Sequence, residues 1–481
     1  MNIELNKKIR TAFGNLAMNK QRLPSSGLTK LGVPAYVGEW ILEEIVPGDG
    51  VLSARELDEL SNFTGQMIPR KNEENVYRNR LITHETVSIL AHLSVEDVIT
   101  RNHQDRLAKL PVLGFHDLFI PDAILEENEN LLKQGMWGIV ELASAQDGGA
   151  QIVGFEPMQA SVNLAAYREK RHQFSDDEWR EMMLVSCGYN PSAYTVAEQI
   201  WILCRLLPLV QKNMHLMELA PKGTGKSFIY ENISPRVKVA AGNLSPAVLF
   251  YNNRSGQPGL IARYDVLVMD EVQKIKFDEP ENIIANLKTY LANGRITRGG
   301  IADIAGDCGL VMLANIALDK NQNPLNDLII AELPVFMRET AFLDRFRGII
   351  PGWKIPKFSQ NSIATSVGLK ADFFSDTLTA MRYETQYAEW VKSRVVFDPM
   401  PIRDENAIVS NAAGLLKILY PDLQISRDAF YNFCVRPALE MRQNVRNQLW
   451  QLDEEFHKYP KELIVEINES GFSESAKTPT I

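Results

Sequence analysis

The stretch LMELAPKGTGKSFIYENIS, residues 216–234, constrains the fold more than any other part of the 481-residue chain. An apolar run leads into a glycine-rich turn that ends in Lys-Ser, and a helical segment follows. The turn matches the pattern G-x-x-x-x-G-K-[ST], except that Ala220 stands at the first glycine position. Ala220 follows directly from the predicted strand, so its methyl group costs little if its φ is negative. This strand–loop–helix context predicts a phosphate-binding loop.

The residues of this loop suit the binding of ATP with Mg²⁺. Gly223 and Gly225 can adopt positive φ, and together with Thr224 they would surround the β-phosphate with backbone N–H groups. Lys226 is expected to reach the β- and γ-oxygens, and Ser227 is expected to ligate Mg²⁺. The alternative is a Gly-Lys-Ser turn that arises by chance.

Two further apolar runs end in polar residues of the kind that such a site needs. The run LIARYDVLVMDEV ends in Asp270 and Glu271, about 44 residues after Lys226. Asp270 would hold the Mg²⁺ water shell, and Glu271 would polarise the attacking water. Asn315 ends the run GLVMLANIAL and is predicted to sense the attacking water or the γ-phosphate. A solvated strand end and an ordinary strand-end asparagine are the respective alternatives.

Arg345 lies in the apolar stretch ETAFLDRFRGIIPGW, where an arginine would be unusual in a core. At a subunit boundary it could act on a neighbour's γ-phosphate as an arginine finger. Arg347 competes for this role, and an intrachain salt bridge is the alternative for Arg345. The order of strand, loop, acidic pair, sensor and arginine, with helices behind them, is that of an AAA+ P-loop ATPase, and it predicts an α/β core over residues 212–400.

The regions before and after the predicted ATPase core differ from it in sequence pattern. Ser53, with Glu56 three residues later, predicts a helix with a capping box. Short β-type runs broken by Pro and Gly favour a small sheet or barrel similar to an OB-fold. The predicted divisions are a helical N-terminal DNA-binding region (1–105), a small OB-like β domain (106–160), a helical connector (161–211), the ATPase core, a helical lid (401–460) and a disordered tail (461–481).

Several stretches resemble the BrxL family, the Lon-related AAA+ proteins of BREX phage-defence systems, whose ATPase is similar to that of MCM helicases. The resemblance covers roughly residues 30–455 and implies a hexameric ring, able to stack as a double ring, that encircles DNA, hydrolyses ATP and works with other BREX components. Longer members carry a Lon-type protease domain after the lid; only about 25 residues follow here, so we expect no protease activity. The stretches are FSDDEWREMMLVSCGYNP, ELAPKGTGKSFIYENISP, VLFYNNRSGQPGLIARYDVLVMDEV, LKTYLANGRITRGG, RFRGIIPGWKIPK and AAGLLKILYPD.

Two glycine-rich insertions, residues 251–259 and 293–309, are predicted to line the pore of such a ring. Arg254, Arg295 and Arg298 would present a basic surface, repeated once per subunit, that grips the phosphates of double-stranded DNA. Solvated hairpin charges are the alternative for each arginine. At the level of the whole protein, the alternatives are a protein unfoldase that works with a separate protease, and an ATP-gated DNA clamp without motor activity.

The composition of the chain is compatible with this prediction and excludes few other classes of protein. With 45% hydrophobic and 23% charged residues, the chain has the composition of a globular protein, and a net charge of −9 does not exclude a locally basic ring lumen. No apolar run is long enough for a membrane span. The four cysteines lie far apart in the sequence and form no CxxC pair. This pattern suits a reducing compartment, and we expect a cytoplasmic protein.

Overall fold

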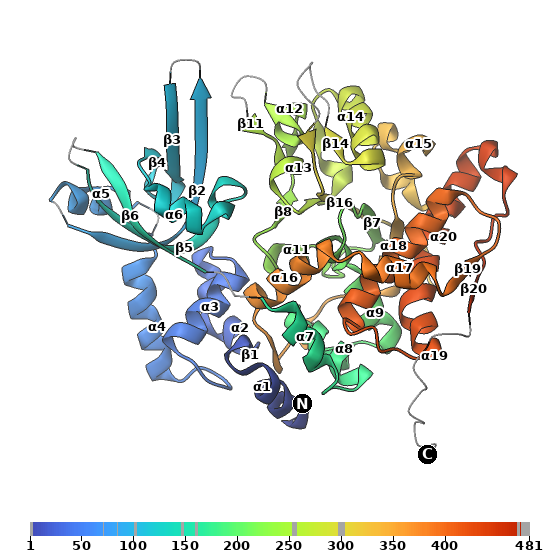
Figure 1. The fold of residues 1–481 in the computed structure, drawn as a ribbon, viewed down its shortest axis with the longest axis horizontal. Coiled ribbons are helices and arrows are strands. Elements are labelled where there is room, and N and C mark those ends of the chain that lie inside the picture. Colours follow the sequence, from blue (N-terminus) through green and yellow to red (C-terminus); the bar gives the residue numbers. More distant parts are fainter. Residues whose placement is uncertain are drawn as a thin grey trace. The chain divides into compact units, whose positions relative to one another are not determined.

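The computed structural model divides into two compact units. One comprises Met1–Lys20 and Val162–Ile481, and the other comprises Gln21–Ser161. The structure describes residues 3–70, 72–83, 85–100, 103–145, 149–158, 162–252, 257–296, 304–468 and 472 (Figure 1). Within these ranges, no helix combines the length and the apolar composition that crossing a membrane requires.

The Gln21–Ser161 unit consists of a helical part followed by an antiparallel sheet in the order β4-β3-β2-β5-β6. A parallel bridge joins Phe119, just after β4, to Gln151 on β6, so the two outer strands approach each other. Ser53 caps α4 through the predicted capping box with Glu56. The helices are α2 (Arg22–Ser26), α3 (Ala35–Ile45), α4 (Ala54–Met67), α5 (Glu74–Ile82) and α6 (Asp122–Glu127). The strands are β2 (Val87–Thr100), β3 (His103–Leu110), β4 (Phe115–Leu118), β5 (Met136–Ser144) and β6 (Ala150–Pro157).

The larger unit is built around a five-stranded sheet, with strand order β17-β7-β16-β12-β8, in which every pairing is parallel. The strand that leads into the phosphate-binding loop, β7, lies inside the sheet, and β16 separates it from β12. The strands of this sheet are β7 (Leu216–Ala220), β8 (Val237–Ala240), β12 (Val266–Met269), β16 (Gly309–Asn315) and β17 (Gly348–Pro351). Strands buried on both faces explain the nearly continuous apolar runs seen in the sequence.

Helices precede, connect and follow the strands of this sheet. Those before it are α1 (Ile3–Phe13), α7 (Leu164–Arg171), α8 (Asp176–Ser186), α9 (Val196–Cys204) and α10 (Leu207–Val210). Those between its strands are α11 (Lys226–Asn232), α12 (Pro246–Leu249), α13 (Leu260–Arg263), α14 (Pro280–Asn293) and α15 (Thr340–Leu343). Those after it are α16 (Ala371–Ala380), α17 (Gln386–Lys392), α18 (Ile402–Leu419), α19 (Arg427–Phe430) and α20 (Arg436–Leu452).

Short strands form two-stranded pairs elsewhere in this unit. Two of these pairs, β10–β11 and β14–β15, are antiparallel and fall on the two predicted insertions. The short strands are β1 (Ala17–Asn19), β9 (Asn243–Leu244), β10 (Tyr251–Asn252), β11 (Gln257–Pro258), β13 (Lys276–Phe277), β14 (Arg295–Ile296), β15 (Ile304–Ala305), β18 (Val367–Leu369), β19 (Val395–Phe397) and β20 (Val465–Ile467).

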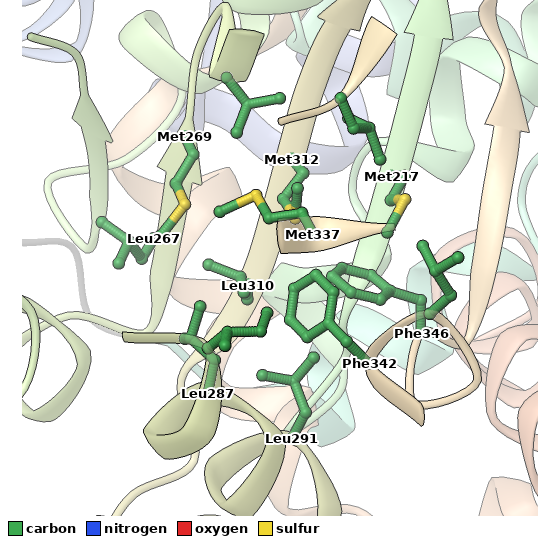
Figure 2. Packing of buried hydrophobic residues seen from close by; sticks show 14 of the residues in the cluster. Met217, Leu267, Met269, Leu287, Leu291, Leu310, Met312, Met337, Phe342 and Phe346 are labelled. Carbon is green, nitrogen blue, oxygen red and sulfur yellow. The ribbon is translucent and has the colours of Figure 1, made fainter. Parts of the chain in front are cut away.

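One face of the parallel sheet packs against α14 and the segment around α15. Figure 2 shows methionines from three strands, Met217, Met269 and Met312, meeting Met337 at the centre of this layer. Leucines and phenylalanines complete the layer, and all of these side chains are buried. Flexible thioether side chains fill the irregular space between sheet and helices. The labelled leucines and phenylalanines are Leu267, Leu287, Leu291, Leu310, Phe342 and Phe346.

Three boundaries differ from those predicted from the sequence. Met1–Lys20, predicted as part of the N-terminal region 1–105, belongs to the larger unit. The sheet of the Gln21–Ser161 unit begins at Val87 rather than near residue 106. Apolar and polar residues alternate along the first part of β2, but β3 opens with four polar residues and gives no strand pattern of its own. Val465–Ile467, inside the predicted disordered tail, pairs with Val395–Phe397. A three-residue strand on an edge carries too little sequence pattern to be recognised before its partner is known.

Candidate nucleotide-binding site

The phosphate-binding loop has the backbone conformation that the sequence predicted. Gly223 and Gly225 have φ values of 83° and 72°, in the left-handed region that glycine adopts without strain. Ala220 ends β7 in register with Asn315, and its φ is not positive, so its methyl group causes no backbone strain. A Cβ on Gly352 would lie 2.5 Å from the Cβ of Ala220. The extra methyl group at position 220 therefore fits because residue 352 has no side chain.

Lys226 and Asn315 meet at the carboxyl end of the sheet. The Lys226 ammonium donates to Asn315 Oδ1 at 2.6 Å. Lys226 is only 7% exposed, and burial lowers the pKa of its ammonium group, whereas the carboxylates of Glu218 and Asp270 favour the charged form. No carboxylate among the described residues forms an ion pair with Lys226, and a buried cation of this kind is suited to receive an anion.

Ser227 and Asp270 form the oxygen-rich part of the site. The Ser227 hydroxyl donates to Asp270 Oδ2 at 2.7 Å. A hydroxyl and a carboxylate are hard oxygen ligands, the kind that Mg²⁺ prefers, so the residues present fit this ion. The Thr224 hydroxyl is buried and has no hydrogen-bond partner among the residues that the structure describes. The loop thus retains donor capacity for a ligand.

Glu271 lies beside this pair in an unusual backbone conformation. Its φ is 47°, and its N–H donates to Asp270 Oδ1 at 2.8 Å. Hydrogen bonds from Lys274 lower the pKa of the Glu271 carboxyl, and Asn315 Nδ2 donates to Glu271 Oε1 at 3.2 Å. Glu271 is therefore ionised at neutral pH and able to accept a proton or a hydrogen bond from water. A non-glycine residue held in the left-handed region is typical of functional sites.

Arg345 and Arg347 lie at the opposite end of the sheet. Both precede β17, whose Gly348 is in register with Leu216 at the start of β7. The five residues of β7 span about 16 Å, so neither arginine reaches the loop of its own chain. Arg345 donates to the Ala341 carbonyl oxygen through Nη1, and its buried Nε has no partner among the described residues.

The acidic residues nearby are already paired with other arginines. Arg442 donates to Asp344 at 2.7 Å and to Asp404 at 2.5 Å, and all three are buried. Arg403 also donates to Asp344. The intrachain ion pair considered as an alternative for Arg345 is not among the ion pairs of the described residues. Arg403 and Arg442 therefore both bind Asp344.

The pore-loop arginines are placed only in part. Arg295 begins β14 and is exposed, and β14 pairs with β15 as a hairpin. Arg254 and Arg298 lie outside the described residues.

Sequence reasoning missed a group of residues behind the loop. The Tyr189 hydroxyl donates to the Gly225 carbonyl oxygen at 2.9 Å, and Phe358 N donates to the Gly223 carbonyl oxygen at 2.7 Å. Arg205 and Glu218 form a fully buried ion pair beneath it. The available signal was one charged residue in each of two apolar runs, ILCRLLPLV and HLMELA.

A parallel sheet with this loop, an Asp-Glu pair and an asparagine at the carboxyl ends of adjacent strands defines a P-loop nucleotide-binding protein. The family model described as "Lon-like protease BrxL-like, ATPase domain" matches residues 150–462. A second, "BREX system Lon protease-like protein BrxL N-terminal", matches residues 11–143. The chain belongs to the BrxL family.

Two curated relatives are named "Lon-like protease BrxL". The protein from Escherichia coli O9:H4 (strain HS) is 28% identical over 428 residues, which cover 87% of this chain and 61% of that protein. The protein from Bacillus cereus (strain H3081.97) is 28% identical over 461 residues, covering 93% and 67% respectively. The chain thus spans about two thirds of the length of these relatives. A full-length MCM homolog from Methanopyrus kandleri is 14% identical with a TM-score of 0.37, covering 89% of this chain and 99% of that one.

Proposed function

We propose that this protein is an ATPase that assembles as an AAA+ ring and moves along double-stranded DNA within a BREX-type anti-phage system.

 The observation that supports ATP hydrolysis most directly is the continuous contact from Lys226 through Asn315 to Glu271. It brings a phosphate-binding cation, a polar sensor and a carboxylate base together at one end of a parallel sheet.

Each residue of the site has a separate role in this proposal. Lys226 and the loop N–H groups bind the β- and γ-phosphates, and Glu271 orients and deprotonates the attacking water while Asn315 holds both in place. Ser227 and Asp270 would hold Mg²⁺, which neutralises charge on the phosphates when bound.

The position of Arg345 supports assembly into a ring. Within its own chain it lies at the far end of the sheet from the loop, so it would act on the nucleotide of a neighbouring subunit. Each site then needs two chains, and a hexamer, able to stack as a double ring, is the arrangement that we propose.

The two hairpins support DNA as the substrate. Arg295 is exposed on β14, and Arg254 and Arg298 belong to the same insertions in the sequence. In the Gln21–Ser161 unit, the strand order, the bridge between Phe119 and Gln151, and α6 between β4 and β5 support an OB-fold, a frequent nucleic-acid-binding architecture. We propose that α18 and α20 form the lid and that the protein works in the cytoplasm.

The test is steady-state ATP hydrolysis by the purified protein alone, with linear duplex DNA, and with an unfolded polypeptide. We expect DNA to stimulate turnover, and the Arg295→Ala/Arg298→Ala variant to lose that stimulation. Lys238→Ala removes an exposed lysine of β8 outside the hairpins and should behave like the wild type.

Each alternative predicts a different result in the same experiment. Stimulation of ATP turnover by the polypeptide but not by DNA would indicate that the protein acts on polypeptides, as an unfoldase does. Tight DNA binding without stimulated turnover or displacement of a bound roadblock would indicate a clamp. Because the named relatives are called proteases, casein degradation is measured alongside; we propose that this chain does not cleave peptides.

A further inference from the structure

We infer that Tyr189, Arg205 and Glu218 form a buried positioning group that sets the conformation of the phosphate-binding loop, so that nucleotide affinity depends on it. The inference rests on the proposed function, because it assigns a role within the same nucleotide site. Arg205 directly follows α9, and Glu218 is the third residue of β7. The three residues are called the positioning group below.

The ion pair at the centre of this group is bidentate and completely buried. Arg205 Nε donates to Glu218 Oε2 at 2.9 Å, and Nη2 donates to Oε1 at 2.6 Å. Both side chains are 0% exposed. Replacing such a pair by apolar residues often leaves stability unchanged or improved, so stability alone does not explain its presence.

The remaining donors of the group contact loop carbonyl oxygens. Arg205 Nη2 donates to the Thr224 carbonyl and Nη1 to the Gly225 carbonyl, each at 3.4 Å. Nη1 also donates to the Tyr189 hydroxyl at 3.0 Å, and that hydroxyl donates to the Gly225 carbonyl at 2.9 Å. Two successive loop carbonyls are therefore held toward the protein interior.

Because of the geometry of the peptide unit, these contacts to the carbonyl oxygens also set the direction of the loop N–H groups. In a planar trans peptide the C=O and N–H bonds point in opposite directions. Holding the Thr224 and Gly225 carbonyls inward turns the N–H groups of Gly225 and Lys226 outward. Successive outward N–H groups form a concave anion site. The positioning group thus aims the donors of the loop without touching the ligand.

Glu218 also acts on the loop lysine. Its carboxylate favours the charged form of Lys226, which burial disfavours. With Arg205 in place, the Glu218 charge is balanced; without it, Glu218 would compete with phosphate for Lys226.

The test compares a double variant with its single variants. Arg205→Met/Glu218→Leu removes the buried charges together, so the melting temperature should stay near that of the wild type. The dissociation constant for a fluorescent ADP analogue and the KM for ATP should both rise at least about tenfold, with kcat changed less than about threefold, because the loop binds ground state and transition state alike. Arg205→Met alone should lose both affinity and stability.

Arg171→Met is the matched control. Arg171 is likewise a buried arginine that donates to backbone carbonyls and a carboxylate, in the same unit but away from the loop. It should lower the melting temperature and leave nucleotide affinity unchanged. Should the double variant fail to fold, Arg205→Lys keeps a cation beside Glu218 without the forked donors, and it should still weaken nucleotide binding several-fold.

The outcomes separate the inference from the proposed function. Wild-type affinity in a folded double variant, or in folded Arg205→Lys, would overturn the inference and leave the proposed function intact. Reduced kcat with unchanged affinity would also overturn it. Failure of the wild type and of Arg171→Met to bind nucleotide would overturn the proposed function itself.

Discussion

The two ends of the parallel sheet carry different kinds of polar site. At the carboxyl end, Lys226, Asn315 and Glu271 contact one another and form a set of complementary groups. At the amino end, Arg345 and Arg347 have no acidic partner within ion-pair distance among the described residues, although Asp344 lies in the same turn. The groups at one end contact one another within a single chain, and the lack of such partners among the described residues at the other end supports the proposal that Arg345 acts on a neighbouring subunit.

The reason for the difference lies in what holds each end. The two carboxylate oxygens of Asp344 already pair with Arg442 and Arg403, so neither is left to form an ion pair with Arg345. Burial lowers the pKa values of both the Arg345 and Arg347 guanidinium groups, with Arg403 and Arg442 adding to the effect. An anion brought to this end would stabilise the charged form of both guanidinium groups.

The largest effect is expected at the carboxyl end. Lys226→Ala removes the cation that we propose binds the phosphates, and we expect ATP turnover to fall on the order of a thousandfold or more. Steady-state hydrolysis and fluorescent nucleotide binding measure the change. Lys222→Ala, an exposed lysine of the same loop, is the control. Retained turnover in Lys226→Ala would show that this end does not carry the chemistry.

A mixing experiment sharpens the comparison between the ends. Arg345→Ala should reduce turnover on the order of a thousandfold, the usual effect of losing an arginine finger. Mixed with Lys226→Ala, it should regain measurable activity, because some interfaces then pair an intact loop with an intact arginine. Arg347→Ala is tested in parallel. Recovery with Arg347→Ala but not with Arg345→Ala would show that Arg347 is the arginine that acts on the neighbouring subunit. No recovery with either variant would contradict a nucleotide site shared between two subunits.

The amino end should also respond to acid. His215 is fully buried, its Nδ1 accepts from Leu310 N at 3.2 Å, and burial lowers its pKa to about 3. The folded pKa lies below the unfolded value, so this stability is complete above pH 6.5 and is lost as pH falls toward 3. The unfolding free energy should fall by about 1.4 kcal/mol per pH unit more in the wild type than in His215→Asn, between pH 6 and 4. Equal slopes in urea titrations would contradict this.

The smallest effect is expected for Tyr189→Phe. It removes the hydroxyl that donates to the Gly225 carbonyl and leaves the aromatic ring in place. Loss of one hydrogen bond of this kind corresponds to a roughly three- to tenfold weaker affinity for nucleotide. A competition assay with the fluorescent analogue measures it. An unchanged affinity would limit the positioning group to Arg205 and Glu218.

The nucleotide-site residues were predictable because each follows an apolar strand. Strands that run parallel end at one edge of the sheet, so Lys226, Asp270 and Asn315 had to come close together once the strands were recognised. The conformations of Gly223 and Gly225 followed from their residue type. The β2–β3 hairpin was not recognised, although buried Val87, Ile89, Ala91, Leu93 and Val95 alternate with mostly less buried residues along β2. Its second strand, β3, opens with four polar residues and shows no such alternation.

The sequence by itself determined the local chemistry of this protein: the loop, the acidic pair, the strand-end asparagine and the order of strands and helices along the chain. Only the tertiary structure decided which distant residues meet. The pairing of Arg205 with Glu218, the space that Gly352 leaves for Ala220, and the separation of Arg345 from its own loop depend on strand order and register. Local sequence patterns report periodicity and residue type, whereas contacts between distant segments follow from how the strands are arranged in the sheet.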